Sequence, residues 1–279
     1  MISKAKLKYI RSLELKKNRR QEGAFVAEGP KVVGDLLCVM RPTLLIATSE
    51  WMGENKHLQQ NSEWMEVSDE ELAKASFLKH PQQVLAVFPT SNTISSPTEG
   101  KATGRRTEFG NGQVGAHLTL MLDGVQDPGN LGTIIRIADW FGISDIYCSL
   151  DTADVYNPKV VQATMGSIAR VNVHYADLVE LIGELPAGTP VYGTMLDGEN
   201  IYETELQPRG VIIMGNEGNG LSPEVIRLLT HRLLIPNYPP NRPTADSLNV
   251  AVATAIVCAE FRRISSLTSH HSPLTSKRP

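Results

Sequence analysis

Short apolar runs alternate with longer polar segments along the chain, and their spacing predicts strands that alternate with helices. In residues 1–90, runs rich in β-branched and aromatic residues predict strands, and segments with apolar residues at helical spacing predict helices. This alternation predicts a compact α/β unit. The expected strands are residues 24–28, 43–48 and 84–88, and the expected helices are residues 4–17 and 29–40.

From residue 117 onward, each apolar run is followed by a glycine-bearing turn and then by a helical segment. Strands that alternate with helices of this length predict a parallel sheet covered on both faces. We therefore expect a second α/β domain built on a parallel sheet. Its expected strands are residues 117–125, 145–149, 169–174, 191–195 and 211–214, and its expected helices are residues 131–141, 157–166 and 247–263.

The segment between these two halves is rich in Ser, Thr, Gly and Pro and carries almost no large apolar side chain. This composition is typical of a mobile linker. The last residues of the chain are polar, as expected of a frayed end. The sequence therefore predicts a domain at residues 1–90, a flexible linker at 91–116, a second domain at 117–265 and a disordered tail at 266–279.

Of the 279 residues, 41% are hydrophobic, which is enough for two folded units. No apolar run reaches the roughly 20 residues that a membrane helix needs, and the N-terminal lysines are not followed by the apolar stretch of a secretory signal. We therefore expect a cytoplasmic protein. Because the three cysteines and seven histidines are scattered, we expect reduced core thiols and no metal site.

Charge is unevenly distributed on a chain whose net charge is −3. Such a net charge argues against a protein that coats nucleic acid. However, eight Lys or Arg residues lie between Lys4 and Arg20, with Glu14 as the one acid among them. This basic segment is expected to be either a phosphate-contacting arm or a solvated helix face.

The first of three polar turns that follow strands lies in residues 122–142, LDGVQDPGNLGTIIRIADWFG. Ligands of open α/β sheets bind where strands end, so each of these turns is a candidate site wall. Asn130 is expected either to cap the following helix or to belong to a site. Arg136, between two isoleucines, is expected either to form a structural ion pair or to bind an anion such as phosphate.

The second turn follows an apolar strand in residues 211–226, VIIMGNEGNGLSPEVI. Its glycines let backbone amides approach a ligand closely, and Ser222-Pro223-Glu224 is expected to begin a helix. The segment GNEGNG lacks the GxGxxG spacing of a dinucleotide site, and no Gly-Lys-Ser/Thr of a phosphate loop follows. A cofactor site and a simple tight turn are both open interpretations.

The third turn lies in residues 233–263, LLIPNYPPNRPTADSLNVAVATAIVCAEFRR. A short strand ends in a proline-rich loop, and the last helix follows. On the residues alone, Ser247 or Asp246 is interpreted as the N-cap of that helix.

Together, these three segments resemble the SpoU family of RNA ribose 2′-O-methyltransferases, members of the SPOUT superfamily. The resemblance includes DGVQDPGNLGTIIRIADWFG, IMGNEGNGLS and IPN with SLNVAVATAIVCAEFRR, in the order and approximate spacing of the family, and it covers residues 117–263. The N-terminal YIRSLELKKNRRQEGAFVAEGPKVVGDLL and HPQQVLAVF are similar to the small substrate-binding domain of many members. The loop NYPPNRPTAD at residues 237–246 is longer and richer in proline than in the family.

This resemblance implies an α/β protein with a C-terminal SPOUT-type parallel-sheet domain, knotted as a trefoil, and a smaller N-terminal α/β RNA-binding domain. It implies that S-adenosylmethionine binds in the knot. It also implies a homodimer whose active site includes residues of the partner. The residues expected to bind S-adenosylmethionine are Thr194, Met195, Gly215, Asn216, Gly218, Ile235, Pro236 and Leu248.

In the implied reaction, the ribose 2′-oxygen attacks the donor methyl group in line and S-adenosylhomocysteine leaves. The hydroxyl must lose its proton, but a guanidinium is normally protonated and is a poor base. We therefore expect Arg136 to stabilise the developing alkoxide and to anchor a phosphate, with base action as a second hypothesis. The residues expected at the catalytic site are Asn130, Arg136, Glu217, Ser247 and Asn249.

Several substrates and functions are compatible with this resemblance. Ribosomal RNA is favoured over transfer RNA because the N-terminal domain is similar to that of members that methylate ribosomal RNA. A non-catalytic RNA-binding protein of the same fold is a second hypothesis, and it predicts loss of donor binding. A dinucleotide-dependent oxidoreductase is a third, but the fingerprint glycines and the acidic ribose partner are missing.

Overall fold

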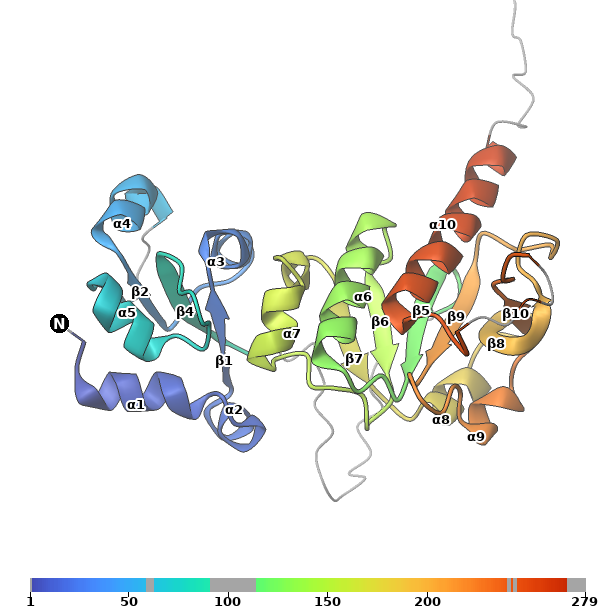
Figure 1. Ribbon diagram of the computed structural model, residues 1–279, viewed down its shortest axis with the longest axis horizontal. Coiled ribbons are helices and arrows are strands. Elements are labelled where there is room, and N and C mark those ends of the chain that lie inside the picture. The colour runs from blue at the N-terminus through green and yellow to red at the C-terminus, as the bar shows by residue number, and fades with distance from the viewer. Residues whose placement is uncertain (1, 59–62, 91–113, 240–241, 243–244, 270–279) are drawn as a thin grey trace, which may run out of the picture. The chain divides into compact units, whose positions relative to one another are not determined.

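The chain forms two compact units in the computed structural model of Figure 1. Residues 91–113 of the predicted linker and 270–279 of the predicted tail lie outside the residues that the structure describes. The described residues are 2–58, 63–90, 114–239, 242 and 245–269. The first unit consists of Met1–Ser95, Gln126–Asp139 and Ala153–His174, and the second of Ser96–Val125, Trp140–Thr152 and Tyr175–Pro279.

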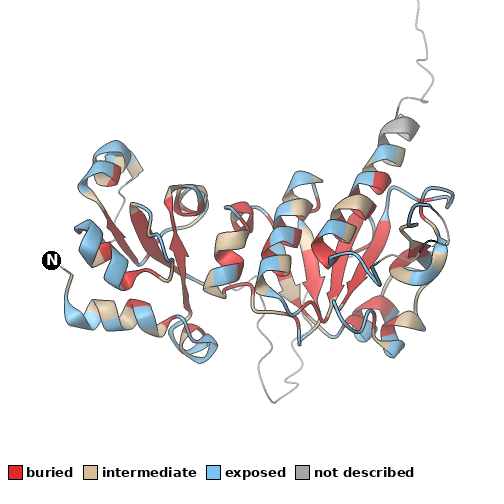
Figure 2. Ribbon diagram, viewed as in Figure 1, coloured by how far each residue is buried: buried red, intermediate tan, exposed pale blue. Residues whose placement is uncertain are grey.

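The first unit contains a four-stranded sheet in the order β1-β4-β2-β3. β4 runs antiparallel to both β1 and β2, and β2 runs parallel to β3. Nearly every residue of β1, β2 and β4 is buried, so these strands are drawn red in Figure 2. The strands are β1 (Ala24–Glu28), β2 (Leu44–Ala47), β3 (Glu63–Glu66) and β4 (Val84–Pro89).

The helix predicted at residues 4–17 is wrong as one element, because the chain forms two helices there. It turns after Ser12, and the turn places Leu13 in the core with no exposed area. The Asn18 amide donates to the Ser12 carbonyl across this turn, at 2.8 Å. The two helices are α1 (Lys4–Ser12) and α2 (Lys16–Glu22).

Other helices of the first unit come from both halves of the sequence. The predicted helix at residues 29–40 is confirmed as α3 (Pro30–Leu37). The predicted helices at 131–141 and 157–166 are confirmed as α6 (Pro128–Trp140), whose last residue is assigned to the second unit, and α7 (Pro158–Ala163). The pattern did not predict β3, nor the helices α4 (Ser49–Asn55), η1 (Lys56–Leu58), α5 (Asp69–Ala75) and η3 (Ser167–Ala169), of which η1 and η3 are 3₁₀ helices.

A six-stranded sheet has the order β10-β8-β9-β5-β6-β7, and all of its described pairings are parallel, as predicted. Its central strands are apolar and buried at nearly every position, which is usual for a parallel sheet covered on both faces. The strands are β5 (Leu118–Asp123), β6 (Asp145–Cys148), β7 (Asn172–Tyr175), β8 (Val191–Asn200), β9 (Gly210–Gly215) and β10 (His231–Leu234).

In the described part of the second unit, the helices that lie wholly within it are α8 (Leu178–Gly183), α9 (Pro223–Ile226) and α10 (Val250–Ser269). The pattern did not predict α8. α10 begins three residues later than the predicted range of 247–263 and ends beyond it. Among the described residues, no helix is both long enough and apolar enough to cross a membrane.

Candidate functional site

The carboxyl ends of β5, β9, β8 and β10 lie at one edge of the sheet in the second unit, because these neighbouring strands are parallel. Ligands of open α/β sheets bind at this edge. Gly215 is the last residue of β9, and Thr194 lies just beyond the part of β8 that pairs with β9. Ile235 and Pro236 follow β10 directly. The structure therefore brings together segments that are far apart in the sequence.

β8 contains an irregularity that the sequence did not predict. The predicted strand ended at residue 195, but β8 continues to Asn200. Its pairing with β10 shifts register, so that Arg232 pairs with Gly193 whereas the next residue, Leu233, pairs with Glu199. Residues 194–198 consequently have no register partner in β10, and this irregularity lies near the carboxyl edge of the sheet.

The segment GNEGNG forms a tight turn at the end of β9. Asn216 and Gly220 exchange two backbone hydrogen bonds, of 2.8 and 3.0 Å. The Asn216 side-chain oxygen accepts from the backbone N–H groups of Gly218 and Asn219, at 2.9 and 3.0 Å. A Cβ on Gly215 would lie 2.4 Å from the carbonyl carbon of Gly220, so only glycine fits there. The tight-turn interpretation is correct for the geometry of this segment.

Two hydrogen bonds join this turn to the end of β5. The Asn216 side-chain amide donates to the carbonyl of Gly124, at 2.7 Å. The backbone N–H of Ser222 donates to Asp123 Oδ2, also at 2.7 Å. These contacts fix the first and second polar turns relative to each other. Sequence analysis missed Asp123, although an acidic residue directly after a buried strand was a signal that could have identified it.

The third polar turn ends at Asn249, which caps α10. Asn249 Oδ1 accepts from the backbone N–H groups of Ala251 and Val252, at 3.0 and 3.3 Å. The interpretation of Ser247 or Asp246 as the N-cap is therefore wrong, because the helix begins later and the Asn249 amide oxygen reaches its first turn. Ser247 and Leu248 are exposed in front of it.

Asn130 does not cap α6, so that interpretation is also wrong. α6 begins at Pro128, and Asp127 Oδ1 accepts from the Asn130 backbone N–H at 2.8 Å. A proline in the first turn is compatible with a cap at Asp127, because proline has no N–H that needs a partner. The Asn130 side chain is partly buried, and its role is therefore not that of a helix cap.

Arg136 lies on α6 with an exposed side chain. It makes no ion pair with any residue in the described part of the chain, so the expectation of a structural ion pair is not supported. Asn130 and Arg136 belong to the first unit, whereas Glu217, Ser247 and Asn249 belong to the second. Glu217 is exposed at the tip of the GNEGNG turn.

The basic segment near the N-terminus divides into structural and exposed residues. Arg19 is 3% exposed, and its guanidinium pairs with Asp154 at 2.6 Å. Arg11 donates to the carbonyl of Ser76 at 2.5 Å, and Lys6 pairs with Glu63. The remaining cations are exposed and are available for a phosphate backbone. They are Lys4, Lys8, Lys16, Lys17 and Arg20.

Comparison with known proteins identifies the family to which the chain belongs. The sequence model of the SpoU rRNA Methylase family matches residues 117–259. The chain belongs to this family. A second model, that of the MRM3-like substrate binding domain, matches residues 4–86. The two matches together account for both halves of the chain.

Several relatives of this SpoU protein match more than nine-tenths of its length. The 23S rRNA (guanosine(2553)-2′-O)-methyltransferase RlmP of Bacillus subtilis is 31% identical over 92% of this chain and 96% of its own. A solved structure of a putative RNA methyltransferase of the TrmH family from Porphyromonas gingivalis is 39% identical, with a TM-score of 0.79 over 95% of this chain and 99% of its own. The AdoMet-bound rRNA methyltransferase from Sinorhizobium meliloti is 31% identical, with a TM-score of 0.77 over 95% and 96%.

Of the three cysteines of this SpoU protein, two are buried and one is exposed. Burial raises the pKa of the Cys148 thiol, and burial raises that of Cys258 to about 12. These two are core thiols, as expected, whereas Cys38 is exposed and the expectation for it is wrong. Among the described residues, no group of three or more His, Cys, Asp or Glu side chains is arranged to bind a metal ion.

Proposed function

We propose that the protein transfers the methyl group of S-adenosylmethionine to a ribose 2′-hydroxyl of ribosomal RNA. The observation that carries this proposal is its full-length similarity to RlmP, whose name states a 23S rRNA 2′-O-methyltransferase. The similarity covers the substrate-binding half as well as the SpoU half. A structural neighbour at 31% identity is bound to AdoMet, which supports S-adenosylmethionine as the cofactor.

We place the donor site at the carboxyl edge of β8, β9 and β10. The irregular backbone of residues 194–198, which has no register partner in β10, is a candidate contact for the edge of a purine base. Leu196 and Leu248 are 73% and 51% exposed, which gives apolar surface for a base and a thioether. These features fit S-adenosylmethionine. The proposed binding residues are Thr194, Met195, Gly215, Asn216, Gly218, Ile235, Pro236 and Leu248.

Asn216 serves this site through its backbone and through the turn that it stabilises. Both ends of its side-chain amide already bond to the protein, the oxygen to Gly218 and Asn219 and the nitrogen to Gly124. Its role is therefore to fix the shape of the donor wall rather than to contact the donor with its side chain.

For the catalytic step we propose Arg136 as the group that stabilises charge. When bound, S-adenosylmethionine supplies an electrophilic methyl group. Transfer of that methyl group to the 2′-oxygen would release S-adenosylhomocysteine, and the hydroxyl proton would pass to solvent. The exposed Arg136 guanidinium stabilises the developing alkoxide and anchors a neighbouring phosphate. The other proposed catalytic-site residues are Asn130, Glu217, Ser247 and Asn249.

We propose that residues 1–90 bind the RNA and that residues 117–265 form the methyltransferase domain. Support for the first of these comes from the match of residues 4–86 to a substrate-binding domain and from the exposed cations of α1 and α2. These cations contact phosphate without reading sequence. The 2′-hydroxyl as target explains a preference for RNA over DNA.

We propose that the protein is a homodimer with a trefoil knot and acts in the cytoplasm. The dimer is supported by an apolar stripe on α10, where Val252 is 51% exposed and Ala255, Ile256 and Ala259 follow at helical spacing. The knot is supported by membership of the SpoU family. The cytoplasmic location is supported by bacterial relatives named for 23S rRNA.

A methyl-transfer assay tests the proposed function. Purified protein is incubated with S-adenosylmethionine labelled in its methyl group and with ribosomal RNA from cells that lack the gene. We expect label in ribosomal RNA and none in transfer RNA from the same cells, and the Arg136→Ala variant is expected to transfer little. Label in transfer RNA alone would overturn the substrate, and absence of donor binding would favour a non-catalytic RNA-binding protein.

A further inference from the structure

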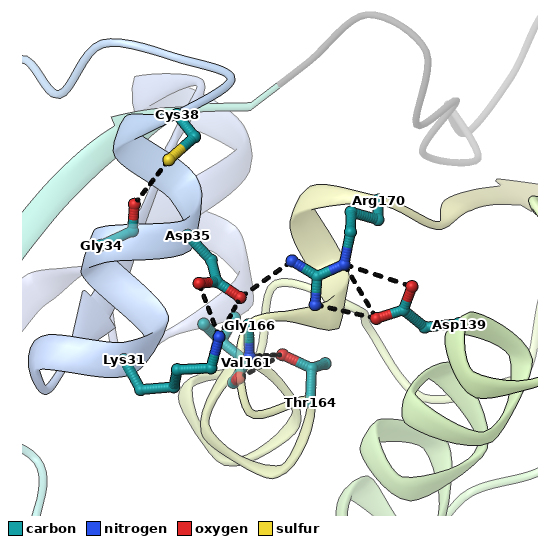
Figure 3. Close-up of polar contacts among 9 residues, drawn as sticks. All are labelled: Lys31, Gly34, Asp35, Cys38, Asp139, Val161, Thr164, Gly166 and Arg170. Atoms are coloured by element: carbon teal, nitrogen blue, oxygen red, sulfur yellow. Dashed lines mark hydrogen bonds and ion pairs between the residues drawn. The ribbon is translucent and has the colours of Figure 1, made fainter.

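One side chain in the first unit bonds to two helices that are far apart in the sequence. Arg170 directly follows η3, and its Nε and Nη2 donate to the Asp139 carboxylate at 2.9 and 2.8 Å. Its Nη1 donates to Asp35 Oδ2, also at 2.8 Å. Figure 3 shows the guanidinium between the two carboxylates.

The two carboxylates belong to elements with different proposed tasks. Asp35 lies on α3, within the residues that match a substrate-binding domain. Asp139 lies on α6, three residues after Arg136, and side chains at this spacing share one face of a helix. Arg170 therefore couples a helix of the RNA-binding part to the helix that carries the proposed charge-stabilising residue.

The segment that carries Arg170 is itself held in place. Gly166 has a φ of +95°, and a Cβ there would lie 2.4 Å from Asp35 Oδ2, so the Asp35 carboxylate packs directly on the Gly166 backbone. The buried Thr164 hydroxyl donates to the carbonyl of Val161 at 2.7 Å. Figure 3 shows the hydrogen bond between Thr164 and Val161 and labels Gly166 beside it. The position of Arg170 is thus set by its own turn and not by the ion pairs alone.

Two further contacts attach the same part of the chain to the N-terminal segment. The nearly buried Arg19 pairs with Asp154 at 2.6 Å, and the rings of Phe25 and Tyr156 stack with centroids 4.6 Å apart. These contacts join residues 1–90 to the segment before α7. The ion pairs of Arg170 with Asp35 and Asp139, called the Arg170 bridge from here on, differ from these contacts because they also reach α6.

The charges of the bridge are in place at neutral pH. Hydrogen bonds from Arg170 hold the pKa of Asp139 below its usual range. Burial alone would raise the pKa of Asp35, but hydrogen bonds from Lys31 and Arg170 lower it overall. Both groups are therefore ionised at neutral pH. A guanidinium contacts them through a fork of fixed geometry, which sets direction as well as distance.

We propose that Arg170 is a positioning residue that fixes α3 of the substrate-binding part relative to α6, so that bound RNA presents its ribose to Arg136. This inference rests on the proposed function. RNA bound through residues 1–90 must place one hydroxyl at the reacting centre, and a displacement of about 1 Å is enough to lower a rate by up to about 100-fold. Arg170 acts through Asp139 and touches neither substrate nor donor.

Arg170→Ala and Lys31→Ala form a matched pair of test variants. Lys31 pairs with the same Asp35 carboxylate, at 2.7 Å, but from within α3, so removing it breaks no contact between helices. For Arg170→Ala we expect kcat for ribosomal RNA from cells lacking the gene to fall about 10-fold or more. KM for this RNA and Kd for S-adenosylmethionine are expected to stay within about twofold. Lys31→Ala is expected to match wild type in all three.

Two more variants separate positioning from folding. Arg170→Lys keeps the charge but loses the fork, so it is expected to restore little of kcat. Asp139→Asn keeps the shape of the side chain and is expected to reproduce the loss, which keeps the test decisive if Arg170→Ala does not fold. Values of kcat for Arg170→Ala and Asp139→Asn equal to that of Lys31→Ala would overturn the proposal.

Hydrogen exchange gives a readout that does not depend on activity. We expect Arg170→Ala to speed amide exchange in residues 30–37 and 128–140 relative to Lys31→Ala. Unchanged exchange in both helices would overturn the bridge. If wild type transferred no methyl group, the proposed function would fail, and faster exchange in Arg170→Ala would still support the bridge between α3 and α6.

Discussion

Asn216 illustrates how one side chain organises the donor wall. Its amide oxygen closes the GNEGNG turn, and its amide nitrogen bonds to the carbonyl of Gly124 at the end of β5. The neighbouring Asn219 contributes its backbone N–H to the same turn. The two asparagines are therefore suitable for a comparison within one loop.

We predict that Asn216→Ala weakens S-adenosylmethionine binding about 10-fold or more, whereas Asn219→Ala changes it less than about twofold. The first variant loses three hydrogen bonds, each contributing about 0.5–1.5 kcal/mol. Isothermal titration with S-adenosylmethionine measures both. Equal affinities in the two variants would contradict the role of Asn216 in shaping the site.

We expect Arg136 to affect the rate of methyl transfer rather than the affinity for S-adenosylmethionine. Because the side chain is exposed, Arg136→Ala should leave the melting temperature and donor affinity unchanged while kcat falls about 100-fold or more. Arg136→Lys is expected to remain well below wild type, because an ammonium lacks the planar fork. A wild-type rate in Arg136→Lys, measured by methyl transfer to ribosomal RNA, would exclude both proposed roles of the guanidinium.

At the scale of elements, α6 and α7 approach each other closely at Gly132. A Cβ there would lie 2.4 Å from the Cβ of Ala163 and 2.7 Å from the carbonyl oxygen of Val160. By contrast, Gly34 on α3 has open space around the corresponding position. Both glycines lie inside helices of the first unit, where alanine has the higher intrinsic helix propensity.

We predict that Gly132→Ala destabilises the protein by about 1–3 kcal/mol and that Gly34→Ala stabilises it by about 0.5–1 kcal/mol. Overpacking outweighs the gain in helix propensity at the first position, and only the gain applies at the second. Denaturant unfolding measures both changes. Stabilisation by Gly132→Ala would show that the two helices separate easily.

The apolar pattern predicted most of the buried strands and missed several short, more exposed elements. The strands β1, β4, β5 and β9 follow from continuous apolar runs. The parallel pairing of the strands in the six-stranded sheet follows from the helices between them. α5 was missed although Ser68 and Glu71 form a capping box there. The shift in β8 could not be predicted, because it depends on the register of β10, which is about 30 residues away along the chain.

For the candidate site, the resemblance supplied residues but not their local roles. The caps at Asp127 and Asn249 replaced the expected ones at Asn130 and Ser247, because which side chain reaches the first N–H groups depends on where each helix begins. Likewise, no sequence pattern indicated that Arg19 would be buried against Asp154, since their contact joins distant segments.

At the scale of the whole molecule, the apolar stripe on α10 predicts self-association. We expect Val252→Asp to convert a dimer into a monomer, because it places a charge in the apolar contact. Val179→Asp on α8, where the wild-type side chain is 39% exposed, is the matched control and should stay dimeric. Light scattering after size exclusion measures the mass. A monomeric wild type would contradict the proposed dimer.

Mass spectrometry of ribosomal RNA tests the central claim most directly. RNA from cells that lack the gene is compared with RNA from the same cells complemented by wild type or by Arg136→Ala. We predict that one 2′-O-methyl nucleotide of ribosomal RNA is missing, returns with wild type and does not return with the variant. An unchanged set of ribose methylations in ribosomal RNA would contradict the assignment of this protein as a ribosomal RNA methyltransferase.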